Sequence, residues 1–251
     1  MDPIYQSLKQ RTREIVSHYP LPGFYRRFSH EAGYAISFLN SNRPLLDLQN
    51  LLSEQLNENL GHGFEHALKV AVDAGTLIMI EGRSAGYSRV FIDRLIFLAQ
   101  AAGLLHDTCR VEKNHARRGA DKAREHLAGY PLTDTEVNYI CRAIYNHEAF
   151  KETLPMPTRA GYLISDCLYD ADKFRWGSDN FSFTLWDMLA FSKVPVEEFV
   201  TRYADGLKTL VKIRGTFRTR TGKTYGPRFI DTGLAIGREL QRVMETEFNL
   251  I

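Results

Sequence analysis

Apolar residues recur along most of the chain at intervals of three and four, the spacing that places them on one face of an α-helix. The stretch 45–80 shows this most clearly, with leucines, valines and alanines that follow a period of about 3.6 residues. Similar patterns cover residues 4–18, 90–105, 117–127, 158–174, 195–213 and 227–248, and another runs from about residue 134 toward His147. Strand-like alternation is scarce. We therefore expect an all-α fold.

Glycine, proline and hydroxyl residues indicate where some of these helices begin and end. Gly61 and Gly63 interrupt the stretch 45–80, which is either two helices or one helix loosened near a site. Gly129-Tyr130-Pro131 ends the helix 117–127. Thr133 or Asp134 is suited to cap the next helix, because a side-chain oxygen can accept the free amide hydrogens of a helix start.

Composition excludes several classes of protein. The chain has 251 residues, enough for one sizeable helical domain or two small ones, and a net charge of +2, too mild to indicate nucleic acid as an obligatory partner. Its three cysteines are widely spaced, which argues against a disulfide framework and fits a reducing compartment. The longest apolar run, residues 95–105, is about half the length of a membrane span. With no visible secretory signal, we expect a soluble, cytoplasmic protein.

Histidine and aspartate residues lie on or beside the expected helices. The pair His106-Asp107 ends the most apolar segment of the chain, where burying both side chains without partners would be costly. Coordination of a metal ion is one way to satisfy both of them, and hydrogen bonds to the backbone at the helix end are another. Other residues of the same type stand at or near helix ends: His66, His115, His147, Asp170 and Asp172.

This order of His, His-Asp, His, His and Asp resembles the HD-domain phosphohydrolase superfamily over roughly residues 60–177. The resemblance implies an HD-domain helical bundle with extra N- and C-terminal helices, in a single all-helical domain of residues 1–251 whose metal-binding core is 60–177. It also implies two sets of metal ligands. The first ion would be bound by His66, His106, Asp107 and Asp172, and a second by His115, His147 and a bridging Asp107.

Two correspondences remain open at this point. Asp170 competes with Asp172 for the place of the last ligand. His62 matches, more loosely, a histidine that precedes the first ligand in some nucleotide pyrophosphohydrolases.

The donor set indicates the metal and the chemistry. Imidazole and carboxylate together suit Mn, Fe, Co, Ni or Zn better than Mg or Ca, and one or two ions could bind. Such an ion activates water and polarises a phosphoryl oxygen, so no protein nucleophile is needed. We predict a metal-dependent phosphohydrolase that cleaves a phosphoester or phosphoanhydride of a small substrate, expected to be a nucleotide. The predicted catalytic residues are Asp107, His115, His147 and Lys173, and Arg110 could also reach a phosphate.

Alternatives from other classes remain. The same ligands could hold a di-iron pair in an oxygenase, or a residual metal site in a nucleotide-binding sensor without turnover. The basic segment 212–228 either contacts a nucleotide or is a mobile surface loop, and within it residues 216–225 are expected to form a loop or short hairpin. The segments 1–60 and 178–251 exceed what the metal core needs, and could cover it or form a homo-oligomer.

Overall fold

The computed structural model describes residues 2–56 and 63–250, and over these residues it is built from helices without a strand. The expectation of an all-α fold is thus confirmed. The helices are α1 (Pro3–Ser17), α2 (Gly23–Arg27), α3 (Ser29–Ser41), α4 (Arg43–Leu56), α5 (Phe64–Ser84), α6 (Arg89–Leu105), α7 (His115–His126), α8 (Asp134–Tyr145), α9 (Arg159–Phe174), the π-helical turn η1 (Asn180–Thr184), α10 (Leu185–Ser192), α11 (Val196–Ile213) and α12 (Arg220–Thr246). No helix in this part of the chain has the length and apolar character needed to cross a lipid bilayer.

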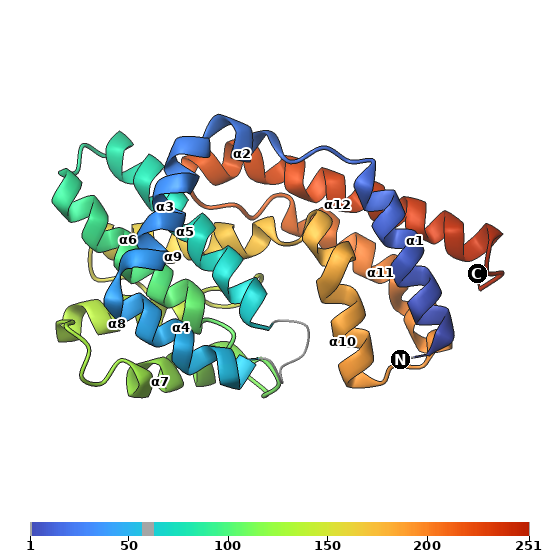
Figure 1. Ribbon diagram of the computed structural model, residues 1–251, viewed down its shortest axis with the longest axis horizontal. Helices are drawn as coiled ribbons and strands as arrows, with labels where there is room; N and C mark the ends of the chain where they lie inside the picture. The colour runs from blue at the N-terminus through green and yellow to red at the C-terminus, as the bar shows by residue number, and fades with distance from the viewer. Residues whose placement is uncertain (1, 57–62, 251) are drawn as a thin grey trace.

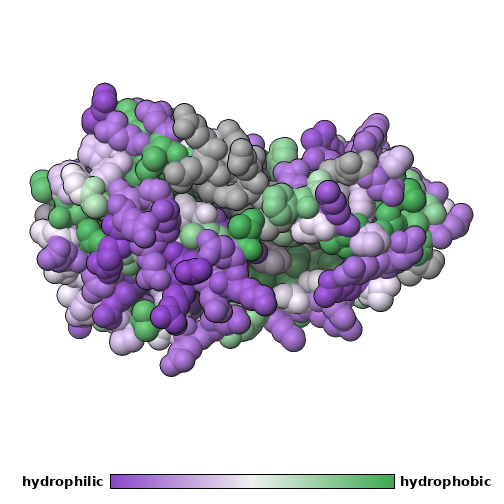
Figure 2. All heavy atoms as spheres, turned by 90° about the horizontal axis from the view of Figure 1, so that it is seen from below, coloured by the Kyte–Doolittle hydropathy of each residue, from purple (hydrophilic) through white to green (hydrophobic). Residues whose placement is uncertain are grey.

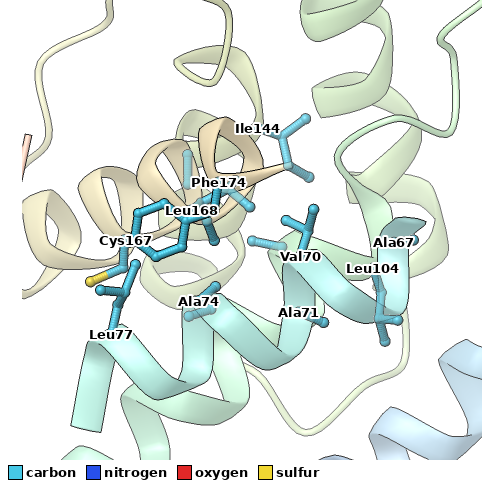
Figure 3. Close-up of a cluster of buried hydrophobic side chains, with 14 of the residues drawn as sticks. Ala67, Val70, Ala71, Ala74, Leu77, Leu104, Ile144, Cys167, Leu168 and Phe174 are labelled. Atoms are coloured by element: carbon cyan, nitrogen blue, oxygen red, sulfur yellow. The ribbon is translucent and has the colours of Figure 1, made fainter. Parts of the chain in front are cut away.

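Helix α5 lies at the centre of the bundle and packs against both α6 and α9 (Figures 1 and 3). Its buried face carries small residues, among them Ala71 and Ala74, which lets its neighbours approach closely. At Gly103 on α6 a Cβ atom would lie 2.6 Å from the Cα of Ala71. The contact between α5 and α6 therefore requires glycine at this position, three residues before His106.

The helices that follow α9 extend the molecule beyond this bundle. Helix α12 is the longest and runs beside α1 and α11, and the two chain termini lie at the same end of the molecule (Figure 1). Phe229 of α12 stacks on Phe174 of α9 with ring centroids 4.2 Å apart, which joins this extension to the bundle.

Local capping signals explain several helix starts. Thr133 caps α8 as expected, and its side chain and that of Glu136 bond each other's backbone amides in a capping box. The stretch 45–80 divides into α4 and α5, with Gly63 at the start of α5. Gly61 and His62 lie outside the described residues.

The C-terminal region corrects one expectation. Residues 216–225 do not form a hairpin, because α12 begins at Arg220 and not near residue 227, and only the residues before it form a loop. Thr219 caps this start by accepting the amide hydrogen of Gly222. Helices α2, α3 and α10 and the turn η1 were not predicted from the sequence pattern.

Candidate metal centre

Five helices meet with their ends turned toward one small region. It receives side chains from the first turns of α5 and α7, the last turn of α9, and the residues that directly follow α6 and α8. One of these side chains, that of His115, is half-buried. The others are buried: His66, His106, Asp107, His147 and Asp172. The candidate residues that lie far apart in the sequence are thus brought together.

The first group of donors surrounds the His106 ring. Its Nε2 atom lies 3.3 Å from Nε2 of His66 and 3.5 Å from Oδ2 of Asp107. Asp172 completes the group, with Oδ1 at 3.5 Å from Nε2 of His66 and 3.8 Å from Nε2 of His106. Asp172 thus lies beside both histidines, and the described ligand atoms of this group that all lie within 4.8 Å of one another are those of His66, His106 and Asp107.

A second group shares Asp107 with the first. Its other oxygen, Oδ1, lies 3.4 Å from Nε2 of His147 and 3.7 Å from Nε2 of His115. The two imidazole Nε2 atoms of this group are themselves 3.3 Å apart. The Asp107 carboxylate thus presents one oxygen to each pair of histidines.

Backbone contacts orient two of the rings. Nδ1 of His106 donates to the carbonyl of Gly103 at 2.7 Å, and Nδ1 of His147 donates to the carbonyl of Ile144 at 2.6 Å. A carbonyl can only accept, so the hydrogen of each neutral ring is on Nδ1 and the lone pair is on Nε2. The lone pairs point into the donor groups. This arrangement is typical of histidines that bind metal ions.

The electrostatics of the first group favour the charge states that a cation needs. Burial lowers the pKa of His106 to about 4, so this ring is neutral at pH 7. Burial alone would raise the pKa of Asp172, but Lys173 and the two neighbouring histidines hold it well below its usual range. Burial also lowers the pKa of His115. Neutral imidazoles and an ionised carboxylate are the forms that bind a metal ion.

The spacing of the donors fits a divalent ion. A nitrogen or oxygen ligand lies about 2.0–2.2 Å from zinc, which places the ligands of one ion roughly 2.9–3.5 Å apart. The shortest separations in the two groups, 3.3–3.5 Å, lie in this range. Among the described residues, two groups have ligand atoms that all lie within 4.8 Å of one another. One consists of His66, His106 and Asp107, and the other of Asp107, His115 and His147.

The two candidate aspartates of α9 have different surroundings. Asp172 faces the histidines, whereas Asp170 accepts hydrogen bonds from the amides of Arg218 and Thr219 and from the Thr219 hydroxyl. Burial raises the pKa of Asp170 to about 6. Asp170 thus supports the loop before α12, and Asp172 is the one of the two that lies beside the histidines.

Lys173 and Arg110 also differ in position. Nζ of Lys173 lies 2.5 Å from Oδ2 of Asp172, so this buried lysine pairs with the carboxylate oxygen that faces away from the histidines. Nη1 of Arg110 lies 3.0 Å from Nε2 of His115 and 3.9 Å from Oδ1 of Asp107. Arg110 is therefore the cation that lies directly beside the second group.

A small cavity of about 30 Å³ opens next to His66 and Asp172. Most of its wall was not predicted from the sequence, because these residues belong to no motif: Arg175, Trp176, Asn180, Thr184 and Met188. Position was the only available signal, since Arg175 follows Asp172 by three residues at the end of α9.

Arg175 is buried and held by acidic partners. It donates to Asp73 and Tyr25, and to Asp179 at 2.6 Å. In the basic segment, Arg218 lies over the Tyr169 ring at 3.6 Å and donates to the backbone carbonyl of Asn146. The segment 220–228 belongs to α12, so it is a helix and not a surface loop.

Fold and site together define a helical protein with a buried histidine–aspartate cluster of the kind that binds divalent metal ions. Residues 63–177 match the family model of the HD domain, from the residue that precedes α5 to the end of the turn after α9. In this segment the chain is similar to the HD domain, a family whose members are generally metal-dependent phosphohydrolases. No curated protein and no solved structure gives a significant match to the chain.

Proposed function

We propose that this protein is a metal-dependent phosphohydrolase that cleaves an ester or anhydride bond of a small phosphorylated compound. The observation that carries the proposal is the position of Asp107, whose two oxygens face two different pairs of histidine nitrogens. A carboxylate shared in this way is suited to bridge two divalent ions.

The first ion would be held by His66, His106, Asp107 and Asp172, and the second by Asp107, His115 and His147. When bound, such ions would polarise a phosphoryl oxygen and lower the pKa of water enough for it to act as the nucleophile near neutral pH. Mn, Fe, Co, Ni or Zn suits this mixed set of nitrogen and oxygen donors.

Arg110 is suited to bind the phosphoryl group. Without a metal ion its guanidinium donates to Nε2 of His115. A cation on that nitrogen would displace and repel the guanidinium, leaving its donors free for the oxygens of a phosphate. Lys173 acts differently in this proposal, because its contact with Asp172 keeps that carboxylate ionised and oriented.

The direct test is hydrolysis by metal-reconstituted protein. Purified protein is stripped with a chelator, reloaded with Mn, Co, Fe or Zn, and assayed against phosphomonoesters, nucleotides and cyclic dinucleotides. We expect phosphate or nucleotide release that depends on the metal and is lost in Asp107→Ala and His115→Ala. His30→Ala is the matched control, since His30 is exposed and on α3. Equal rates for Asp107→Ala and the native protein would refute the proposal.

Two other outcomes would indicate a different function for the same site. Oxygen consumption by the iron-loaded protein, without phosphate release, would identify a di-iron oxygenase, because a shared carboxylate also suits a pair of iron ions. Tight nucleotide binding without turnover under any metal would identify a sensor. Metal content measured on the same preparations separates both outcomes from a simple failure to load the site.

A further inference from the structure

A second, larger cavity lies next to the candidate metal centre. Its volume is about 330 Å³, and it is bounded by η1 and α10 on one side and by α11 on the other. Figure 2 shows a hollow with hydrophobic residues on its floor between the two ends of the molecule. A cavity of this volume is within the usual range for small-molecule sites.

The two cavities share part of their walls. Trp176, Asn180 and Met188 line the small cavity beside His66 and Asp172, and they also line the large one. The loop and helices that directly follow the last candidate ligand thus form the boundary between both spaces. The small and large cavities are therefore neighbours, separated by these three shared side chains.

The small cavity is lined by more polar residues than the large one. Asn180, Thr184 and Met188 are four residues apart on η1 and α10 and line the small cavity, and Asn180 and Met188 also line the large one. The neighbouring stripe faces the large cavity and is apolar: Phe181, Leu185 and Leu189. A ligand that spans both spaces would therefore meet polar groups at one end and hydrocarbon at the other.

Helix α11 forms the opposite wall, which is mostly apolar and also includes Arg202 and Thr209. Phe199, Leu207 and Leu210 line the cavity, and the hydroxyl of Tyr203 already donates to the carbonyl of Gly237 at 2.8 Å. A nucleobase would bring several hydrogen-bonding groups into these surroundings, and burying them without partners is costly. An alkyl group has no such cost, and its burial is favourable.

We propose that the large cavity binds the hydrocarbon part of the substrate, so that the substrate is an amphiphilic phosphate ester such as an alkyl or prenyl phosphate. This proposal rests on the phosphohydrolase function proposed above. It assigns the phosphoryl end to the histidine–aspartate groups and Arg110, and the apolar end to the space between α10 and α11.

Gly206 offers a sharp test. It lies on α11 and lines the large cavity, and a Cβ atom at this position would meet nothing within 4 Å. Gly206→Leu therefore fills part of the cavity without a clash, and it also replaces a helical glycine, which favours folding. Gly33→Leu is the matched control, because Gly33 is an exposed glycine on α3 with equal room for a side chain.

The first experiment measures kcat/KM of the metal-loaded protein for methyl, butyl and octyl phosphate. We expect an increase of about fourfold per methylene that enters the cavity. In Gly206→Leu the ratio of octyl to methyl phosphate should fall by about tenfold, the equivalent of roughly two methylenes. Gly33→Leu should keep the native ratio. A flat chain-length dependence, or a preference for nucleotides over octyl phosphate, would overturn the proposal while leaving the phosphohydrolase function intact.

The second experiment measures binding without turnover. Octylphosphonate and methylphosphonate are titrated calorimetrically into the metal-loaded protein at several temperatures. We expect tighter binding of the octyl compound, with a more negative heat-capacity change, and a weaker affinity for it in Gly206→Leu. If this pattern holds and no phosphate ester is hydrolysed, the cavity assignment stands and the phosphohydrolase function fails. If Gly206→Leu instead dissociates a dimer and leaves octylphosphonate affinity unchanged, a second copy of the chain occupies the cavity and the proposal is wrong.

Discussion

The Nε2 atoms of His66 and His106 lie 3.3 Å apart, although 40 residues separate the two histidines in the sequence. Because His106 donates its Nδ1 hydrogen to Gly103, its Nε2 lone pair points toward His66. Two buried nitrogens this close can hold a shared cation, and the carboxylates of Asp107 and Asp172 supply the opposite charge. The charge and geometry of this contact underlie the function proposed for the protein.

Asp170 and Asp172 of α9 should respond differently to the same substitution. Asp172→Asn removes a charged donor beside His66 and should weaken metal affinity by more than about 100-fold, since even loss of an outer partner of a ligand costs about 10–100-fold. Asp170→Asn should keep the metal and lower stability, because Asp170 accepts three hydrogen bonds from Arg218 and Thr219. Elemental analysis and denaturant unfolding of both variants check this. Metal loss in Asp170→Asn with full retention in Asp172→Asn would reverse the assignment.

The close approach of α5 and α6 should depend on Gly103. A Cβ atom there would lie 2.6 Å from the Cα of Ala71, which is backbone that cannot move aside cheaply. Gly103→Ala should therefore lower the free energy of unfolding by about 1–3 kcal/mol. Gly33→Ala, an exposed helical glycine with open space around it, should raise it by about 0.5–1 kcal/mol. Urea unfolding of both variants measures the difference, and equal stability would contradict the role of Gly103.

Arg175 and Asp73 form a buried ion pair beside the small cavity. Arg175→Met leaves Asp73 buried with only Tyr25 as a neutral partner, and it should destabilise the metal-free protein by about 3–5 kcal/mol. The double variant Asp73→Leu with Arg175→Met should recover most of this loss, because no uncompensated charge remains. Denaturant unfolding in the presence of a chelator tests both. If the double variant were as unstable as Arg175→Met, the uncompensated charge of Asp73 would not be the cause of the lost stability.

Stability at acid pH should depend on Glu136. Its hydrogen bonds to Arg94 lower the pKa of this glutamate from 4.5 to about 2. Because the pKa of Glu136 is lower in the folded protein than in the unfolded chain, the ionised carboxylate stabilises the fold above pH 4.5. This contribution disappears as the pH falls toward 2. We expect about 1–2 kcal/mol at pH 7, discounted because the Arg94 side chain is 38% exposed.

Glu136→Gln provides the measurement. Unfolding of the metal-free native protein and of the variant is compared from pH 7 to pH 2.5. The difference in the free energy of unfolding should be constant down to about pH 5 and shrink below it. A difference that stays constant through this range would exclude the ionised carboxylate as its cause.

Helix positions and donor residues were largely predictable because both depend on local signals. The apolar period of about 3.6 residues predicts α5, α6, α8 and α9, and Thr133 caps α8 as its side chain indicates. The start of α12 was predicted wrongly. Gly222 suggests a loop, but a Cβ atom at this position would lie 1.9 Å from Asp170, and one at Gly226 would lie 2.5 Å from the Phe217 ring. These glycines serve close packing, which no local pattern distinguishes from a turn.

What the sequence determined by itself was the all-α class and the order of histidines and aspartates at helix ends, since periodicity and residue chemistry are properties of short segments. The tertiary structure decided which side chains meet. Asp170 and Asp172 are both buried carboxylates on one helix, and only the packing of α5, α6 and α12 around α9 gives them different partners. The cavity between α10 and α11 is likewise a product of packing, because its walls come from residues that carry no motif and are adjacent only in the folded chain.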